Sequence, residues 1–154
     1  MSPSKATTIV RTESSDPDFP LLVALLNFEL RERYGEAQVV YDTFNVISNL
    51  DTVVIAYRDD VAAGCRCFKK IDEKTVEIKR MFVKPGERKH GVASAILSEV
   101  EVWAKEDGFS YVILETAHKQ HEAIAFYKKQ GYKIIPNYGP YVGMETSICF
   151  GKKL

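Results

Sequence analysis

The chain has 154 residues, a length typical of one domain that can bury a hydrophobic core. Hydrophobic residues make up 45% and charged residues 27%, close to the globular average, and 21 basic side chains balance 21 acidic ones. Because there is no basic excess, the composition argues against nucleic acid and against an anionic membrane as partners. Any anion site must therefore be local.

The cysteines and the N-terminus indicate the compartment. The three cysteines are Cys65, Cys67 and Cys149. This odd, sparse set predicts reduced, buried thiols rather than a disulfide framework. Residues 1–8 lack the apolar core of a signal peptide, and the longest apolar run, residues 21–26, is too short to span a bilayer. We expect a cytoplasmic protein with a flexible tail over residues 1–7 and a single domain over residues 8–154.

The hydrophobic periodicity predicts the elements of the N-terminal half. They are a strand over 8–11, a helix between Asp16 and Gly35, a weaker helix over 39–47, and a hairpin of strands over 53–57 and 61–68. Asp59 and Asp60 form the predicted hairpin turn.

The C-terminal half alternates strands and helices. It begins with a strand over 76–83 and a helix from Val92 to the Asp107-Gly108 stop. There follow a buried strand over 111–114, a helix over 122–129 ending at Gly131, and strands over 132–135 and 146–150. This order predicts a mixed sheet covered by helices on both sides.

The junction between the strand over 76–83 and the next helix is the most informative segment. The run Arg88-Lys89-His90-Gly91-Val92-Ala93 sets cationic side chains and backbone amides at a helix N-terminus. Unpaired first-turn amides and the positive end of the helix dipole favour anions. The junction therefore predicts a phosphate-binding site.

Two motifs resemble those of the GCN5-related N-acetyltransferase (GNAT) family. Arg88, Gly91 and Ala93 fill the family's six-residue signature of Gln or Arg, two residues, Gly, one residue, then Gly or Ala. Residues 126–132, Phe-Tyr-Lys-Lys-Gln-Gly-Tyr, resemble the second hallmark, a tyrosine helix closed by glycine and an aromatic. The resemblance implies an α/β (α+β) fold with a mixed, mostly antiparallel central sheet of six to seven strands, flanked by about four helices.

The resemblance also implies acetyl-coenzyme A as cosubstrate. His90, His118 and His121 have no Cys or acidic cluster at ligand spacing, so we expect no metal. The pyrophosphate would bind at the loop and helix start, and a break in the strand near residues 81–83 would offer backbone groups to the pantetheine arm. The implied coenzyme-binding residues are Met81, Phe82, Val83, Arg88, Lys89, His90, Gly91, Val92, Ala93 and Ser94. The alternative for the loop alone is a basic surface turn leading into a helix.

Two residues are candidates for proton transfer. Glu77 lies eleven residues before Arg88, the offset at which some family members carry a general base. Its alternative role is an exposed strand residue pairing with Lys79 or another neighbour. The resemblance implies that the Tyr127 hydroxyl donates a proton to the departing thiolate, whereas the alternative is a core aromatic. The family's asparagine after the preceding strand is absent, and His118 or Gln120 would serve there.

The acceptor pocket is expected between the first two helices and the loop over residues 136–145. Its candidate lining residues are Tyr34, Tyr41 and Asn45 on one side and Tyr138, Tyr141 and Met144 on the other, and Arg66 could pair with an acceptor carboxylate. These tyrosines suit a small, partly apolar amine. We expect acetyl transfer to a primary amine of a small molecule. The alternatives are a non-catalytic acyl-coenzyme A sensor or interaction domain and an enzyme acting on protein amines. An exposed strand edge would permit a homodimer.

Overall fold

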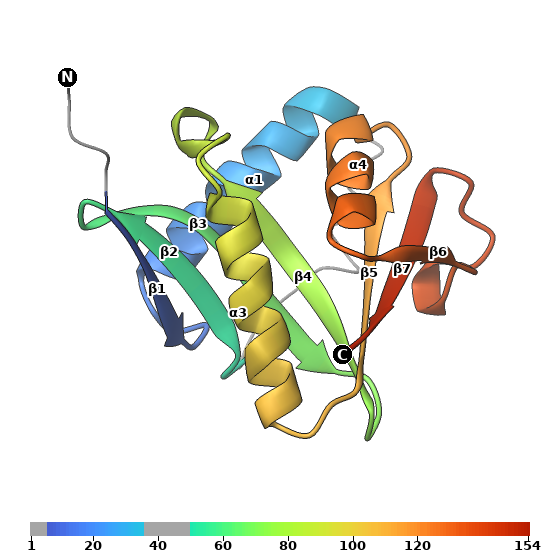
Figure 1. Cartoon of the computed structure of the whole chain (residues 1–154). Coiled ribbons are helices and arrows are strands. Elements are labelled where there is room, and N and C mark those ends of the chain that lie inside the picture. Colours follow the sequence, from blue (N-terminus) through green and yellow to red (C-terminus); the bar gives the residue numbers. More distant parts are fainter. Residues whose placement is uncertain (1–5, 36–49) are drawn as a thin grey trace. The chain divides into compact units, whose positions relative to one another are not determined.

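The computed structural model describes residues 6–35 and 50–154. The strands are β1 (Thr7–Thr12), β2 (Val53–Arg58), β3 (Val61–Lys70), β4 (Thr75–Val83), β5 (Tyr111–Ala117), β6 (Lys133–Ile135) and β7 (Ser147–Lys153). The α-helices are α1 (Asp18–Tyr34), α3 (Val92–Glu106) and α4 (His121–Lys129), and short 3-10 turns occur at η1 (Pro85–Glu87) and η2 (Gly139–Tyr141). Figure 1 shows these elements along the chain.

The strands follow the order β1-β2-β3-β4-β5-β7-β6 in a seven-stranded sheet. The pairs β1–β2, β2–β3, β5–β7 and β6–β7 are antiparallel, and β4–β5 is parallel. This confirms the mixed, mostly antiparallel sheet of six to seven strands. Three α-helices lie in the described ranges, and the helix predicted over 39–47 lies outside them.

The chain divides into two compact units. The first comprises Met1–Lys69 and Lys79–Val102, and the second comprises Lys70–Ile78 and Trp103–Leu154. Strand β4 and helix α3 each run from one unit into the other, so each unit is described separately.

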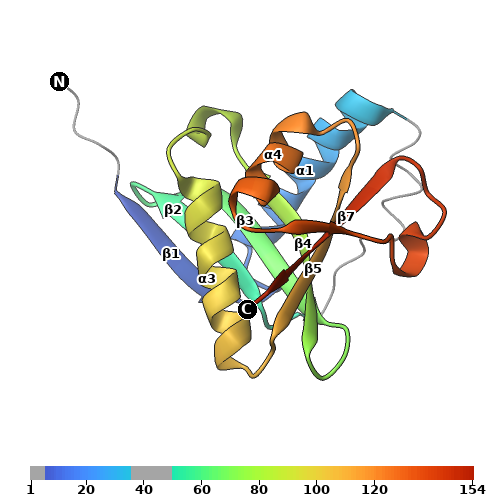
Figure 2. The ribbon, with the colours of Figure 1, turned by 45° about the vertical axis from the view of Figure 1, so that its right-hand side comes forward.

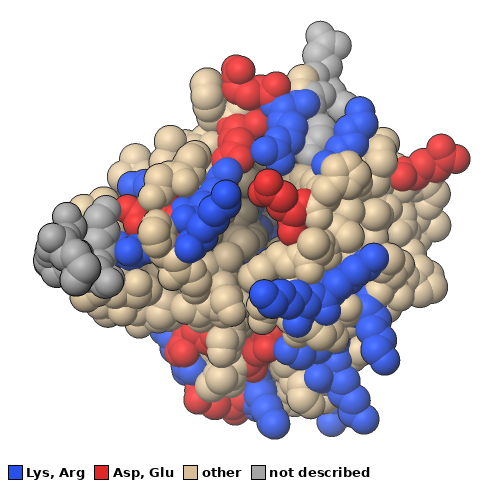
Figure 3. Space-filling model, turned by 45° about the horizontal axis from the view of Figure 1, so that its top comes forward, with Lys and Arg blue, Asp and Glu red and all other residues tan. Residues whose placement is uncertain are grey.

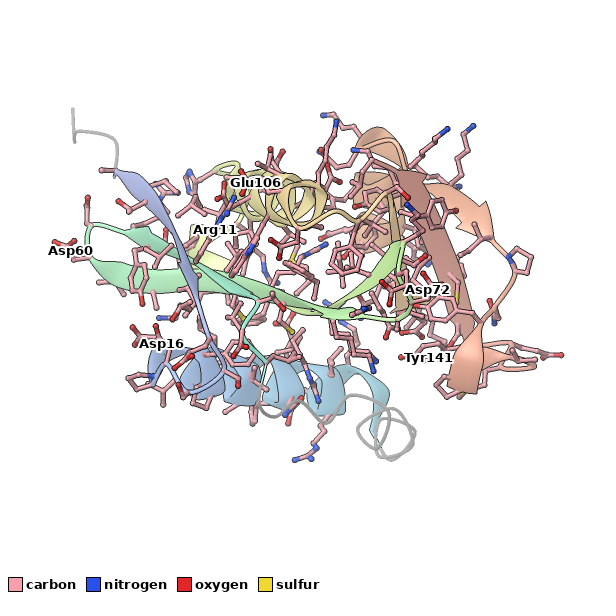
Figure 4. All side chains as sticks on the ribbon, turned by 90° about the horizontal axis from the view of Figure 1, so that it is seen from below. Arg11, Asp16, Asp60, Asp72, Glu106 and Tyr141 are labelled. Atoms are coloured by element: carbon pink, nitrogen blue, oxygen red, sulfur yellow. The ribbon has the colours of Figure 1, made fainter. Side chains whose placement is uncertain are left out.

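In the first unit the strands lie between α1 and α3 (Figure 4). The α1 side is a cluster of buried apolar side chains: Phe19, Leu22, Val53, Ile55, Cys65, Cys67 and Phe82. On the other side Gly64 of β3 lies against Ile96 of α3, and a Cβ at Gly64 would lie 2.7 Å from the Phe82 carbonyl oxygen. Strand β2 is apolar on both faces because both are covered, as expected for a central strand.

In the second unit α4 lies over β5 and β7 (Figure 2). Tyr127 of α4 contacts Phe150 of β7, with ring centroids 5.8 Å apart. Strands β5 and β7 are longer than predicted, since Glu115–Ala117 pair with Ser147–Cys149 and the Gly151–Lys153 end of β7 pairs with Tyr111–Ile113. Hydrogen bonding along a ladder extends these strands beyond the apolar runs from which they were predicted.

No helix within the described residues is long and apolar enough to cross a membrane.

Candidate functional site

The loop between β4 and α3 belongs to the first unit and carries the predicted anion site. After η1, Lys89 and Gly91 both adopt left-handed backbone conformations, with φ of 67° and 78°. Lys89, His90 and Gly91 are exposed. Glycine is the residue that adopts this conformation without strain, which accounts for Gly91 at the turn into α3.

The backbone amides of this loop are available to a ligand. Within the described part of the chain, none of the amides from Lys89 to Ser94 donates to a backbone carbonyl, and the first bond of the helix runs from the Ala95 N–H to the Gly91 oxygen (3.0 Å). These donors lie at the positive end of the fifteen-residue helix α3. Their arrangement fits an anionic group such as pyrophosphate.

The distribution of surface charge bears on how this loop could attract an anion. Basic and acidic side chains are interspersed over the face in Figure 3, in keeping with a net charge of zero. Binding of a phosphate at this loop would therefore depend on local donors rather than on a broad positive field.

The guanidinium of Arg88 is already engaged within the first unit. Its Nε donates to the Val83 carbonyl (2.8 Å), and one terminal nitrogen lies 3.0 and 2.7 Å from the two carboxylate oxygens of Glu29 in α1. The guanidinium also lies 5.8 Å from the centre of the Phe82 ring. Arg88 thus ties the loop to α1 and to the end of β4.

A second ion pair fixes the start of the loop. Arg58, at the end of β2, lies 3.2 Å from a carboxylate oxygen of Glu87 in η1, and both side chains are largely buried. The turn that leads to Arg88 is therefore held against β2.

Strand β4 is irregular where the pantetheine arm is expected. Arg80 has a left-handed φ of 56°, one residue before the predicted break over 81–83. The Arg80 and Lys79 carbonyls accept weak hydrogen bonds from the Cys65 and Cys67 thiols, at 3.4 and 3.3 Å. A side-chain bond from Arg80 to Asn27 of α1, at 2.6 Å, also stabilises the kink.

Glu77 lies in the second unit and is buried, with 4% of its surface exposed. It is the last β4 residue in the parallel ladder, opposite Ile113 of β5. One carboxylate oxygen accepts a hydrogen bond from the Tyr138 hydroxyl, 2.7 Å away. The alternative of an exposed strand residue therefore does not describe Glu77.

The carboxylate of Glu115 lies on the same sheet face as Glu77. Ladder partners share a face, and Glu115 is two residues beyond Ile113, the partner of Glu77. Glu115 accepts a hydrogen bond from the Ser147 hydroxyl at 2.7 Å. Neither Glu115 nor the Tyr138–Glu77 bond was found from the sequence, because both depend on pairing between segments far apart in the chain.

Tyr127 is 6% exposed and sits in an aromatic cluster of the second unit. Its ring centroid lies 5.4 Å from that of Phe126 and 5.7 Å from that of Tyr132, in edge-to-face geometry. This packing fixes the ring, as the core-aromatic interpretation requires, and a fixed ring also gives its hydroxyl a defined position.

Two of the other candidate substrate-binding residues are buried. Tyr141 is 1% exposed, and Arg66 is fully buried. Arg66 pairs with Val54 across the β2–β3 ladder and so lies on the face opposite the α1 cluster. Tyr41, Asn45 and the Tyr34 side chain lie outside the described residues.

The residues proposed to replace the family's asparagine each lie within hydrogen-bonding distance of another residue. One ring nitrogen of His118 lies 3.2 Å from the Thr146 carbonyl, and the side chain of Gln120 accepts from the Thr116 hydroxyl at 3.2 Å. Within the described residues there is no group of three or more His, Cys, Asp or Glu side chains suited to a metal ion.

Comparison with known proteins identifies the family. The model of the Acetyltransferase (GNAT) family matches residues 19–132, and the chain belongs to this family. It is 35% identical over 102 residues to the IAA acetyltransferase of Azospirillum brasilense, covering 66% of this chain and 67% of that protein. It is 30% identical over 117 residues to "Probable N-acetyltransferase 14" of Xenopus tropicalis, covering 75% of this chain but only 56% of that protein.

Solved structures agree on the fold. An N-acetyltransferase from Thermoplasma acidophilum in complex with coenzyme A matches with a TM-score of 0.69 and 20% sequence identity, over 97% of this chain and 99% of that chain. The family resemblance of the two motifs is thereby confirmed at the level of family and fold.

Proposed function

We propose that this protein is an N-acetyltransferase that moves the acetyl group of acetyl-coenzyme A directly to a primary amine of a small molecule. The observation that carries the proposal is the row of backbone amides from Lys89 to Ser94 at the start of α3, in a chain that belongs to the GNAT family. A coenzyme A-bound relative of the same fold supports the choice of cosubstrate.

The loop would hold the coenzyme mainly through its backbone. The amides of Lys89–Ser94 meet the pyrophosphate, and the Lys89 side chain adds charge. Met81, Phe82 and Val83 follow the kink at Arg80 and offer strand backbone to the pantetheine arm. When bound, acetyl-coenzyme A supplies an activated thioester.

Glu77 and Tyr127 are the proposed proton-transfer groups. Glu77 takes a proton from the attacking amine, as the bond from the amine nitrogen to the acetyl carbon forms and the carbon–sulfur bond breaks. Tyr127 donates its proton to the leaving sulfur, so that the products are an amide and the free thiol. The burial of both side chains supports these roles, since a shielded site favours proton transfer between fixed partners.

A small acceptor is supported by the aromatic character of the segment around the carboxylate. The rings of Tyr138 and Tyr141 pack edge to face with centroids 5.6 Å apart, and Tyr138 binds Glu77 directly. Aromatic walls with a few placed polar groups are typical of small-molecule sites.

The second candidate is a domain that binds coenzyme A without catalysis. The test is a thiol-release assay with acetyl-coenzyme A and a panel of arylalkyl amines, polyamines and lysine peptides, combined with thermal unfolding with and without the coenzyme. We expect turnover with a small amine, lowered at least about 100-fold in Glu77→Gln.

The outcomes separate the candidates. Thermal stabilisation by the coenzyme without turnover on any amine supports the binding domain. Turnover on peptides alone overturns the small-molecule acceptor. Absence of stabilisation by the coenzyme overturns both candidates, because a bound ligand must stabilise the folded state.

A further inference from the structure

Glu77 is held by a residue that is distant in sequence. The Tyr138 hydroxyl donates to one of its carboxylate oxygens at 2.7 Å, and the two residues are 61 positions apart. This contact lies wholly within the second unit. Hydrogen bonds to a charged acceptor are among the stronger ones in proteins.

The backbone around Tyr138 is anchored at several points. Its carbonyl accepts from the Tyr141 N–H at 2.9 Å. The side-chain amide of the preceding Asn137 lies 3.0 to 3.2 Å from the carbonyls of Tyr141, Met144 and Ser147. The segment therefore presents the Tyr138 hydroxyl in a fixed position.

The phenol of Tyr138 remains a donor over the working pH range. Burial raises the pKa of Tyr138, and the charge of Glu77 and the hydrogen bond to it raise that pKa further. A phenol with a raised pKa keeps its proton, so at neutral pH it can only donate to the carboxylate.

Other titratable and charged groups lie near Glu77. Of the titratable groups on β5 and β7, those near Glu77 in the ladder include Glu115, which is bound by Ser147, and Cys149, whose pKa is raised by burial. The thiol therefore stays neutral near pH 7. On β4 itself, Lys79 follows two residues along.

We propose that Tyr138 is a positioning residue that orients the Glu77 carboxylate for taking the proton of the acceptor amine. The proposal rests on the proposed function, in which Glu77 is the base. Tyr138 itself exchanges no proton with the substrate.

The test is the pH dependence of kcat in Tyr138→Phe. Without the phenol, the ionised carboxylate loses a donor and is protonated more easily, so we expect the acidic limb of the profile to move up by about one pH unit. Below the limb, kcat falls about tenfold, while on the alkaline plateau it changes much less. The affinity for coenzyme A stays unchanged.

Two control variants remove comparable hydroxyl donors. Tyr57 donates to Asp18 at 2.6 Å in the first unit, and Ser147 donates to Glu115. Tyr57→Phe and Ser147→Ala should leave the acidic limb in place. An equal shift in either control would assign the effect of Tyr138→Phe to general destabilisation and overturn the proposal.

A double-mutant cycle separates positioning from packing. If Tyr138 acts through Glu77, adding Tyr138→Phe to Glu77→Gln causes no further loss of kcat. Losses that multiply would show that the tyrosine has only a structural role.

A titration that does not need turnover separates the two proposals. The Glu77 carboxyl can be followed by NMR with carboxyl-labelled glutamate, its signal assigned by its loss in Glu77→Gln. We expect a higher titration midpoint in Tyr138→Phe, and an unchanged midpoint overturns the inference. If the midpoint moves but the wild type transfers no acetyl group to any amine, the proposed function fails, and the catalytic role of Tyr138 fails with it.

Discussion

Gly91 illustrates how one residue shapes the candidate anion site. Its φ is 78°, and a Cβ built there would have no atom within 4 Å. The requirement for glycine is therefore conformational rather than one of space within the protein. We predict that Gly91→Ala lowers the free energy of unfolding by about 1–2 kcal/mol, the cost of a left-handed conformation in a residue with a Cβ.

The same substitution should weaken binding of coenzyme A roughly tenfold, if the strain is relieved by turning the amides away from the ligand. Calorimetric titration and urea unfolding measure the two effects. Gly86 is the matched control, because it lies in the same loop, has equal space and lacks a positive φ. A Gly86→Ala effect as large as that of Gly91→Ala would contradict this explanation.

The β2–β3 turn is also decided at single residues. Asp59 and Asp60 have φ of 49° and 66°, the left-handed pair typical of a two-residue hairpin turn. We predict that Asp60→Gly raises the free energy of unfolding by about 0.5–1 kcal/mol, as measured by urea unfolding.

Asp59 offers the comparison for that turn. Its carboxylate accepts a hydrogen bond from the Ala6 N–H at 3.1 Å. Asp59→Gly gains the same backbone freedom but loses this bond, and it should therefore stabilise less than Asp60→Gly. The reverse order would show that the Asp60 side chain has a stabilising role of its own.

At the scale of elements, α1 and the loop between β4 and α3 are joined by the pair Glu29–Arg88. The two side chains are 28% and 38% exposed, so the pair should contribute less than about 1 kcal/mol to stability. The pair should affect coenzyme A binding more than stability. Glu29 pairs with the Arg88 guanidinium, which lies next to the backbone amides proposed to bind pyrophosphate.

We predict that Glu29→Gln tightens the binding of coenzyme A by up to about fivefold at low salt, because it removes a negative charge and releases Arg88. Calorimetric titration at two ionic strengths measures this change, and the gain should shrink at high salt. The control is Glu32→Gln, an exposed carboxylate on the same helix. Weaker binding in Glu29→Gln would show instead that the ion pair organises the loop.

At the scale of the whole molecule, the free energy of unfolding should decrease at alkaline pH. Burial raises the pKa of the Cys65 and Cys149 thiols and of the Tyr57 and Tyr138 phenols. A raised pKa in the folded state stabilises fully below the unfolded value and less as the pH rises above it. Those unfolded values are about 8.5 for cysteine and 10 for tyrosine.

We therefore predict that the contribution of these groups to the free energy of unfolding is constant up to about pH 8. Above about pH 8.5 it should decrease steadily. Urea unfolding between pH 7 and 10.5 measures it. Tyr57→Phe should make the decrease shallower above about pH 10, where the unfolded phenol would ionise. A curve that is flat to pH 10.5 would contradict the burial of these groups.

Most of the fold follows from local patterns in the sequence. Alternation and helical spacing predict the strands, and Gly35, Gly108 and Gly131 end helices with positive φ as their positions suggest. The C-terminal ends of β5 and β7 could not be predicted in this way, because Glu115–Ala117 and Gly151–Lys153 are polar or small. Each segment becomes strand only because it pairs with the neighbouring strand, β7 or β5 respectively.

The candidate site divides in the same way. The candidate anion loop is local in sequence, so its turn at Gly91 and the start of α3 could be predicted from spacing, and the family resemblance rests on the same segment. The partners of its side chains could not be predicted. That Arg88 binds Glu29, or that Glu77 is buried under Tyr138, depends on residues 59 and 61 positions apart.

The sequence by itself therefore determined the family, the strand and helix order and the position of the candidate phosphate-binding loop, because each depends on neighbouring residues and their backbone preferences. Only the tertiary structure decided which carboxylates are buried, which donors hold them and which cations are already paired. Those properties arise from burial and long-range hydrogen bonds, for which a linear pattern carries no signal.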